Sequence, residues 1–343
     1  MRSAGCWHRS LAASSAPTTD ASSGTRAPTD FSTGPRPPPS VGSEPARLFL
    51  QHQRDLYRYI HDQTLRLANL GFTPDEIAEQ LAEPGFLKQD FSTRGYYGTL
   101  NHNSKAVYQR YFGWWDGVPA HLHALPPEEA AHKYVEFMGG PAQLLAKARK
   151  SFDQGDYRWS AEVLNHLVFS DPANQAARNW LAASYEQLGF QAESAIWRNY
   201  YLVAAQELRH GPAGQGAVKL GNADFLRAVP SGMLFDSLSV RFNPAKAGGS
   251  SYVLNFEFPD RSEKLCVIVG DDVAVPRMDC HAEDAAATAR MDRVTLDEIL
   301  LGSAKFADRV ADGSIRITGD HAAVSAHLAS LDEFPYWFNV VTP

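Results

Sequence analysis

Apolar residues recur at near-helical spacing over the first part of the folded sequence. Between about residues 45 and 70 they fall on one stripe formed by Phe49, Leu56, Ile60 and Leu67. This spacing predicts a long amphipathic helix, and Gly71 supplies its end. Thr73, Pro74 and Glu76 then form the pattern of a capping box, which predicts a second helix that ends before residues 84–85.

Helical spacing continues through the middle of the chain. Residues 126–129 open a helix that Gly139 and Gly140 end. Between residues 141 and 209, small and apolar residues recur as they do in two or three helical hairpins, with turns at 155–156 and 171–172. This stretch resembles tetratricopeptide repeats, and ordinary helix packing explains the same pattern equally well.

Beyond residue 220 the period of the pattern changes to two. Residues 238–242 and 252–258 alternate, and a turn at 260–263 separates the second run from the apolar run 264–269, so a hairpin is expected. Helices are expected at 295–301, 303–311 and 320–331, with a strand at 314–318. The pattern predicts an α+β domain in which helices cover one side of an antiparallel sheet.

Composition narrows the class of protein. Hydrophobic residues make up 44% of the 343 residues and charged residues 21%, which is typical of a soluble globular protein of about two domains. A net charge of -7 argues against a general nucleic-acid-binding protein. No apolar stretch reaches the roughly 18 residues of a membrane span.

Residues 1–45 differ from everything after them. They hold seven of the 21 prolines and lack apolar periodicity, so we expect a disordered segment. No apolar core of a signal peptide is visible, and the prolines fit a transit peptide poorly, so a cytoplasmic location is the default expectation. Cys6, Cys266 and Cys280 are few, odd in number and widely spaced, which predicts neither a disulfide framework nor a Cys-rich zinc site.

The run from residue 94 to residue 117 gathers Tyr, His, Asn, Arg and Trp side chains between glycines. A plain core helix has no use for so many hydrogen-bonding aromatic side chains, so this run is expected to face a ligand or another domain. A loop is expected at 94–102 and a helix from about Ser104. The candidate substrate-side residues are Tyr97, His102, Asn103, Tyr108, Arg110 and Tyr111.

A family resemblance rests on five stretches, residues 53–64, 94–117, 165–169, 186–194 and 197–201. With them, the chain from about residue 46 resembles the latter part of the metallo-β-lactamase-type alkyl sulfatases. The resemblance implies an α+β multidomain fold and a homodimer. Its parts would be the disordered segment 1–45, an all-α dimerisation domain with repeat-like hairpins at 46–211 and a sterol-carrier-like α+β domain at 219–343.

The same family has an N-terminal domain that holds two zinc ions through a His-x-His-x-Asp-His cluster and further ligands. No such cluster occurs in this sequence, and residues 37–42 lack the histidine that the resemblance places before the long first helix. Zinc is therefore the family's implied cofactor, but we expect none in this chain and no activity of this chain alone. A truncated reading frame and a subunit that needs a partner both explain the difference.

The resemblance also implies that some side chains of the 94–117 run bind sulfate or protonate a leaving group. Arginine offers sulfate oxygens a planar donor fork, and His or Tyr can hold a transferable proton. The alternative is that these residues tie helices together by hydrogen bonds. His61 and Asp62 are expected to be structural, because adjacent residues do not face each other on a helix. The spacing of His281 with Asp279, Cys280 and Glu283 predicts no metal site.

Hydrolysis of sulfate esters of long-chain alcohols is the reaction that the resemblance implies for the intact family, with this chain keeping the dimerisation and alkyl-chain-binding parts. Long-chain alkyl sulfate or lipid is the expected small-molecule partner. Two alternatives are a non-catalytic lipid- or surfactant-binding protein and a helical-repeat scaffold for protein association. The apolar residues that would line a lipid tunnel, or simply form a core, are Phe235, Val253, Phe256, Phe306, Phe334 and Phe338.

Overall fold

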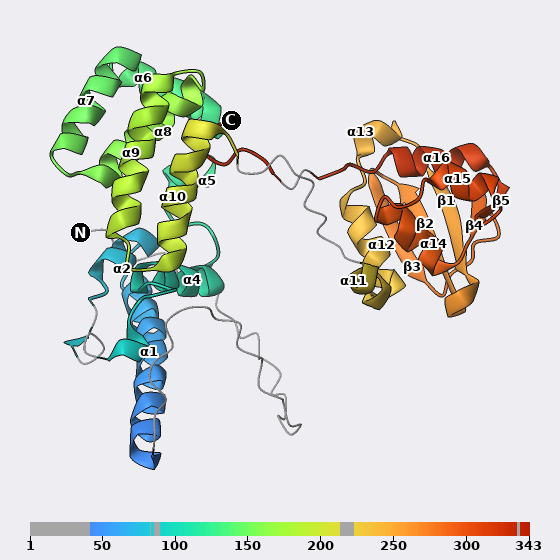
Figure 1. Ribbon diagram of the computed structural model, residues 1–343, viewed down its shortest axis with the longest axis horizontal. Helices are drawn as coiled ribbons and strands as arrows, with labels where there is room; N and C mark the ends of the chain where they lie inside the picture. Colours follow the sequence, from blue (N-terminus) through green and yellow to red (C-terminus); the bar gives the residue numbers. More distant parts are fainter. Residues whose placement is uncertain (1–41, 83, 86–89, 213–222, 335–336) are drawn as a thin grey trace. The chain divides into compact units, whose positions relative to one another are not determined.

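The computed structural model describes residues 42–82, 84–85, 90–212, 223–334 and 337–343 (Figure 1). The chain divides into two compact units, residues 1–94 with 104–110 and residues 95–103 with 111–343. The disorder expected at 1–45 falls almost wholly outside the described residues, although a helix already begins at Ser43. None of the described helices is long and apolar enough to cross a membrane.

In the first unit a long helix is followed by a short capped one. Helix α1 spans Ser43–Asn69 and α2 spans Pro74–Gln80, as the sequence predicts. The Glu76 N–H donates to Thr73 Oγ1 at 3.4 Å, and the Thr73 N–H donates to the Glu76 carboxylate at 2.9 Å, so the predicted capping box is confirmed. The small buried core of this unit is formed by Leu67, Ile77 and Leu81.

A polar clip joins α1 to the short 3-10 helix η1 (Phe91–Thr93). His52 Nδ1 lies 2.6 Å from Asp90 Oδ2, and Gln53 Nε2 donates to the Ser92 carbonyl at 2.8 Å. Burial raises the pKa of Asp90, but hydrogen bonds from His52 and Ser92 outweigh it and lower the pKa overall. Local sequence patterns do not predict this clip, because His52 and Asp90 are 38 residues apart in the chain.

Helices α4 (Leu100–Phe112), α5 (Pro119–Leu122) and α6 (Pro127–Phe137) follow. The sequence predicts α6 but not the single turn of α5. The expected start of a helix near Ser104 is wrong, because α4 begins at Leu100. Thr99 explains the earlier start, since its hydroxyl accepts the His102 N–H at 2.9 Å and so satisfies a donor of the first turn.

The predicted helical hairpins are present as four helices that pack in sequence order (Figure 1). They are α7 (Pro141–Asp153), α8 (Tyr157–Ser170), α9 (Gln175–Gln191) and α10 (Ala195–His210). A Cβ added at Gly189 would lie 3.0 Å from the Leu202 side chain, so a larger residue would push α9 and α10 apart. Ser160 and Ser184 meet at 3.1 Å between α8 and α9, which shows why small residues are needed there.

The C-terminal part is an α+β domain with a five-stranded sheet in the order β3-β2-β1-β4-β5. The strands are β1 (Tyr252–Phe258), β2 (Glu263–Gly270), β3 (Val273–Met278), β4 (Ala287–Arg290) and β5 (Arg316–Gly319). The α-helices are α11 (Ala223–Ala228), α12 (Ser231–Val240), α13 (Pro244–Ala247), α14 (Arg293–Leu300), α15 (Phe306–Ala311) and α16 (His321–Ala329). The predicted hairpin is confirmed, because Tyr252 of β1 lies opposite Val269 of β2 in an antiparallel pair.

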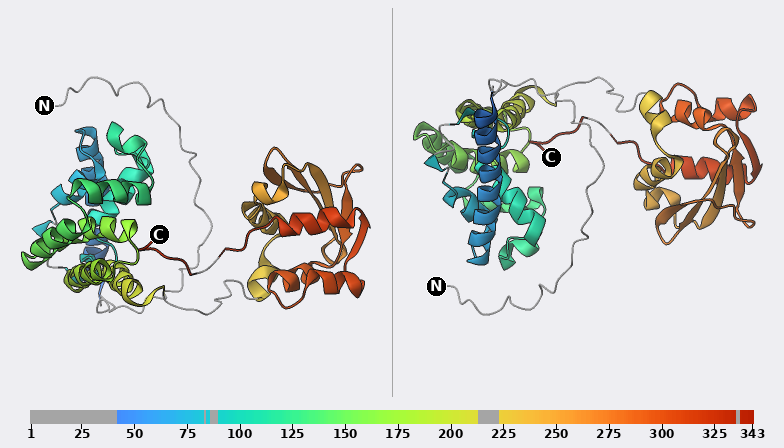
Figure 2. Two further views of the ribbon diagram at one scale, coloured as in Figure 1. Left: turned by 90° about the horizontal axis from the view of Figure 1, so that it is seen from above. Right: turned by 90° about the horizontal axis from the view of Figure 1, so that it is seen from below.

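Two expectations for this domain are wrong. Residues 238–242 are not a strand, because Leu234, Phe235 and Leu238 form the buried stripe of helix α12. The sheet is mixed rather than antiparallel, because β4 runs parallel to β1. The helices do lie on one face of the sheet, where they share a single apolar core with it (Figure 2).

The other face of the sheet carries the crossover from β3 to β4. Asn255 points away from the core residues beside it in β1, and its side-chain amide exchanges two hydrogen bonds of 2.9 Å with the backbone of Ala282. Cys266 and Cys280 form a disulfide with their Cα atoms 5.3 Å apart. The expectation of no disulfide framework misses this single bridge, because the pairing of β2 with β3 brings together two residues that are 14 positions apart in the sequence.

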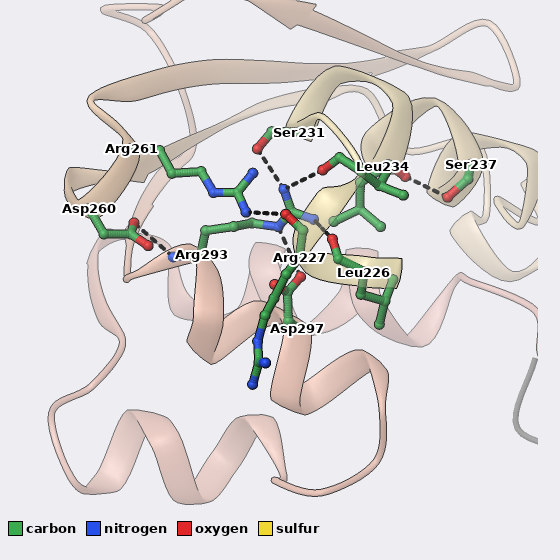
Figure 3. Close-up of polar contacts among 10 residues, drawn as sticks. Leu226, Arg227, Ser231, Leu234, Ser237, Asp260, Arg261, Arg293 and Asp297 are labelled. Atoms are coloured by element: carbon green, nitrogen blue, oxygen red, sulfur yellow. Dashed lines mark hydrogen bonds and ion pairs between the residues drawn. The ribbon is translucent and has the colours of Figure 1, made fainter. Parts of the chain in front are cut away.

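A buried arginine fixes α11 and α12 to α14 (Figure 3). Arg293 is fully buried and its guanidinium donates to Asp297 at 3.0 Å and to the Ser231 hydroxyl at 2.8 Å. It also donates to the carbonyls of Leu226 and Val229, at 3.0 and 3.2 Å, where α11 ends. Arg293 lies in the first turn of α14. Its guanidinium therefore donates to carbonyls at the end of α11 that have no partner within that helix.

Candidate functional site

The start of the 94–117 run is a compact loop that leads into α4. A Cβ added at Gly98 would lie 2.8 Å from Asn103 Nδ2, so only glycine leaves room for the Asn103 amide to fold back over the loop. A Cβ added at Gly95 would similarly lie 3.1 Å from the Gly98 carbonyl. The two glycines are therefore needed by the packing of this loop, and Asn103 is held against it.

Helix α10 anchors this loop from a distant part of the chain. The Ala195 N–H donates to the Tyr96 carbonyl at 2.7 Å, and the Ser194 hydroxyl donates to the Tyr97 carbonyl. Ser194 also caps α10 by accepting the Trp197 N–H at 3.4 Å. The loop and the first turn of α10 therefore form one hydrogen-bonded structure, which holds the Tyr97 side chain at the surface.

The hydrogen bond from Trp197 determines the tautomer of the neutral His102 side chain. The indole Nε1–H donates to His102 Nδ1 at 3.2 Å, and the two rings meet edge to face with centroids 6.3 Å apart. An indole N–H can only donate, so Nδ1 must accept, and the proton of the neutral imidazole is then on Nε2. His102 is exposed, so this Nε2–H is available as a donor at the surface of the loop.

The other predicted site residues lie in different surroundings. Tyr108 packs against the core of the first unit, which favours a structural role for that side chain. Arg110 also belongs to the first unit and is exposed. Tyr111 belongs to the second unit and is also exposed. The structure therefore places Tyr97 on the loop and His102 and Asn103 in the first turn of α4 that follows it, and α10 anchors this loop.

The second half of the run forms a local turn that sequence reasoning missed. The Val118 N–H donates to Asp116 Oδ1 at 2.9 Å, and His121 Nδ1 lies 2.6 Å from Asp116 Oδ2. These contacts lower the pKa of Asp116, and the hydrogen bond from the Val118 N–H is the largest cause. Trp115 donates to the Val118 carbonyl at 3.0 Å, whereas Trp114 is 71% exposed. An Asp two residues before a turn amide is a recognisable signal for this arrangement.

One pair behaves differently from its sequence-based expectation. His61 Nδ1 lies 2.7 Å from Asp62 Oδ1, and Arg58 lies 2.9 Å from the other oxygen. The expectation that these adjacent side chains do not meet is wrong, because the imidazole and the carboxylate lie within hydrogen-bond distance. The hydrogen bond from His61 is the largest influence that lowers the pKa of Asp62.

The described residues do not fit a zinc site. Among them, no group of three or more His, Cys, Asp and Glu residues has a geometry that could hold a metal ion. His281 lies 3.5 Å from Glu257, which also contacts Lys264 at 3.0 Å and Arg290 at 3.2 Å. Glu257 therefore serves as the acceptor of a cluster of cations on the sheet, and Lys264 is the largest influence that lowers its pKa.

The aromatic residues of the C-terminal domain fall into two groups. Phe235 and Phe256 lie in the core with ring centroids 5.0 Å apart, and Phe306 packs on that core. Phe334 and Phe338 are exposed. The core explanation holds for the first group, and the lipid tunnel stays a prediction.

The architecture defines a class of protein. A helical domain is followed along the chain by an α+β domain, and solved structures of alkylsulfatases are similar to this fold. The inverting sec-alkylsulfatase Pisa1 from Pseudomonas sp. matches with a TM-score of 0.83 and 38% identity, over 88% of this chain and 47% of that chain.

Sequence comparison gives the same result. The alkyl sulfatase dimerisation model matches residues 73–211, and the alkyl sulfatase C-terminal model matches residues 219–343. The chain therefore belongs to the alkyl sulfatase family, and it carries the dimerisation and C-terminal domains of that family.

Its relatives are longer than the chain. A linear primary-alkylsulfatase from Pseudomonas sp. is 43% identical over 89% of this chain and 45% of the relative. The alkyl/aryl-sulfatase BDS1 of Saccharomyces cerevisiae is 44% identical over 89% of this chain and 47% of the relative. The chain thus spans about half the length of these curated relatives.

Proposed function

We propose that this chain dimerises and recognises the alkyl sulfate in an enzyme that hydrolyses sulfate esters of long-chain alcohols. The observation that carries the proposal is the loop of Tyr97 together with His102 and Asn103 in the first turn of α4, which α10 holds in place. The two matched domains and the names of the relatives support the same class of substrate.

The chemistry of the loop suits a sulfate group. The Nε2–H of His102, the Asn103 amide and the Tyr97 hydroxyl are all hydrogen-bond donors, and hydrogen bonds to a charged group are the stronger ones. A proton on Nε2 of His102 can also pass to the oxygen of a departing alcohol. The loop needs no reorganisation for this, because Trp197 already holds Nδ1 as an acceptor.

Water activation is not assigned to this chain. The family resemblance implies zinc chemistry, but the described residues do not fit a zinc site. The chain alone is expected to release no sulfate from dodecyl sulfate. Elemental analysis and a sulfate-release assay test this, and two zinc ions per chain with chelator-sensitive release would contradict it.

The helical domain supplies the surface for a homodimer. Phe137 is 91% exposed on α6, and an interface between two copies would remove such an aromatic side chain from water. Other large apolar side chains exposed on the helical domain are Trp114, Phe190 and Tyr200. The dimerisation model matches this part of the chain, which supports two copies of the chain as the assembly.

Calorimetric titration with dodecyl sulfate below its micelle concentration tests the recognition loop. Substitution His102→Ala removes one donor to a charged ligand and should weaken binding about tenfold or more. His132→Ala removes an exposed histidine of α6 and should leave the affinity unchanged. Equal affinities for all three proteins would reject the loop as the sulfate site.

A further inference from the structure

The last residues of the chain return to the helical bundle. The backbone N–H groups of Val340 and Val341 both donate to Glu207 Oε1, at 2.7 and 3.0 Å. Val341 is only 6% exposed and lies in the same apolar cluster as Leu181 and Leu208 of helices α9 and α10. The tail therefore makes one polar and one apolar contact with the end of this helix pair.

Glu207 is built to receive such a segment. It is only 7% exposed, and a carboxylate removed from water is costly unless hydrogen bonds replace the water. In the described part of the chain, its side-chain donors are the two amides of the tail. These bonds are charge-assisted and are made by the backbone, so the carboxylate recognises the backbone of the segment rather than a particular side chain.

The surroundings of Glu207 are rigid. Arg178 of α9 donates to the Leu208 carbonyl at 2.7 Å and so holds the last turn of α10 against α9. Within the tail, Asn339 donates to the Pro343 carbonyl at 3.1 Å and closes the segment into a turn. These two hydrogen bonds lie within each partner, so ordering that they impose before docking would lower its entropy cost.

We propose that Glu207 and the apolar site around Val341 form a peptide-recognition site whose occupant is the chain's own segment 339–343. The chain itself connects the N-terminal end of the C-terminal domain to the helical bundle. This docking would connect the C-terminal end of that domain to the bundle as well. Asp332 and Val340 are eight positions apart in the chain, so their Cα atoms can be at most about 29 Å apart. Docking thus limits how far the domain can move from the bundle, and undocking extends its reach.

Hydrogen exchange of the Val340 and Val341 amides in the full chain tests the proposal. We expect both amides to exchange at least about tenfold faster in Glu207→Ala than in the unchanged protein, with Glu207→Gln in between because it keeps an acceptor. Glu136→Ala is the matched control, since Glu136 is an exposed carboxylate of α6. It should leave both amides protected.

A second variant keeps the test decisive if loss of Glu207 harms the bundle. Val341→Ser changes only the tail, so it should speed exchange at residues 340 and 341 while the amides of α8 and α9 stay protected. A peptide of residues 337–343 should bind a chain that lacks them, and N-methylation at 340 and 341 should abolish that binding. Tail amides that exchange in the unchanged protein as fast as in the free peptide would overturn the proposal.

Discussion

Arg293 stabilises the C-terminal domain through bonds that no smaller side chain can replace. Substitution Arg293→Leu would leave Asp297 buried without its cation, which costs about 3–5 kcal/mol in comparable cases. The double variant Arg293→Leu/Asp297→Leu should recover part of that loss, because the unpaired charge is gone. Denaturant unfolding, monitored by hydrogen exchange in β1, measures the free energy of unfolding of the single and the double variant. Equal stability of the single variant and the unchanged protein would contradict the role assigned to Arg293.

His327 makes the same domain sensitive to acid. It is 5% exposed, it meets the Tyr252 hydroxyl at 3.2 Å, and burial lowers its pKa from 6.5 to about 4. Between these values the unfolded chain binds more protons than the folded one, so stability is complete above about pH 6.5 and falls towards pH 4. The loss is at most about 3 kcal/mol.

Melting temperatures between pH 7 and pH 4 check this expectation. Substitution His327→Asn should flatten the pH dependence, because the group that titrates is gone. His321→Asn changes an exposed histidine of the same helix and should leave the profile as it is. A profile that stays equally steep in His327→Asn would assign the acid sensitivity to other groups.

Single residues were predictable where their partners are close in the sequence. Thr73 and Glu76 were identified from a spacing of three residues, and the structure shows both bonds. Arg293 was not identified, because its partner Ser231 is 62 residues away. The sequence predicts His102 as a candidate, but its hydrogen bond depends on Trp197, which is 95 residues away. Local patterns can therefore name a site residue without fixing its geometry.

The crossover between β3 and β4 depends on the Cys266–Cys280 disulfide. This bridge spans a sequence separation of 14 residues, for which the loss of unfolded-chain entropy corresponds to about 3 kcal/mol. Reduction should therefore lower the melting temperature of the C-terminal domain. The Asn255–Ala282 bonds remain, so the crossover should loosen rather than detach.

Thiol counting in denaturant provides the direct check on the disulfide. The sequence has three cysteines, so one free thiol is expected before reduction, that of Cys6, and three are expected afterwards. The variant Cys266→Ser/Cys280→Ser should melt at the temperature of the reduced protein. Three free thiols in protein purified without reductant would show that the bridge does not form.

Helices and strands were predicted where the signal is strong and local. The long stripe and end signals of α1, and the hairpin of β1 and β2, agree with the structure. Strand β4 has only four residues and pairs in parallel with β1, so its existence depends on a distant partner. The five-residue alternation at 238–242 was too short to compete with the helical stripe of α12.

The proposed assembly of two chains would cover large apolar side chains that are exposed on the helical domain. A homodimer would have twice the 37.7 kDa of one chain, and sedimentation equilibrium at micromolar concentration distinguishes the two masses. The dimer is expected because the apolar surface that includes Phe137 is costly to leave in water. A single species with the mass of one chain would count against the proposed assembly.

Recognition of a long-chain alkyl sulfate is the central claim, and its most direct test is a calorimetric series with decyl, dodecyl and tetradecyl sulfate below their micelle concentrations. Each buried methylene should add at most about 0.8 kcal/mol, so affinity should rise up to roughly fifteenfold for each pair of carbons. The corresponding alcohols should bind more weakly, because they lack the charged group that the loop of His102 would contact. Flat affinity across the series, or no binding, would contradict the account.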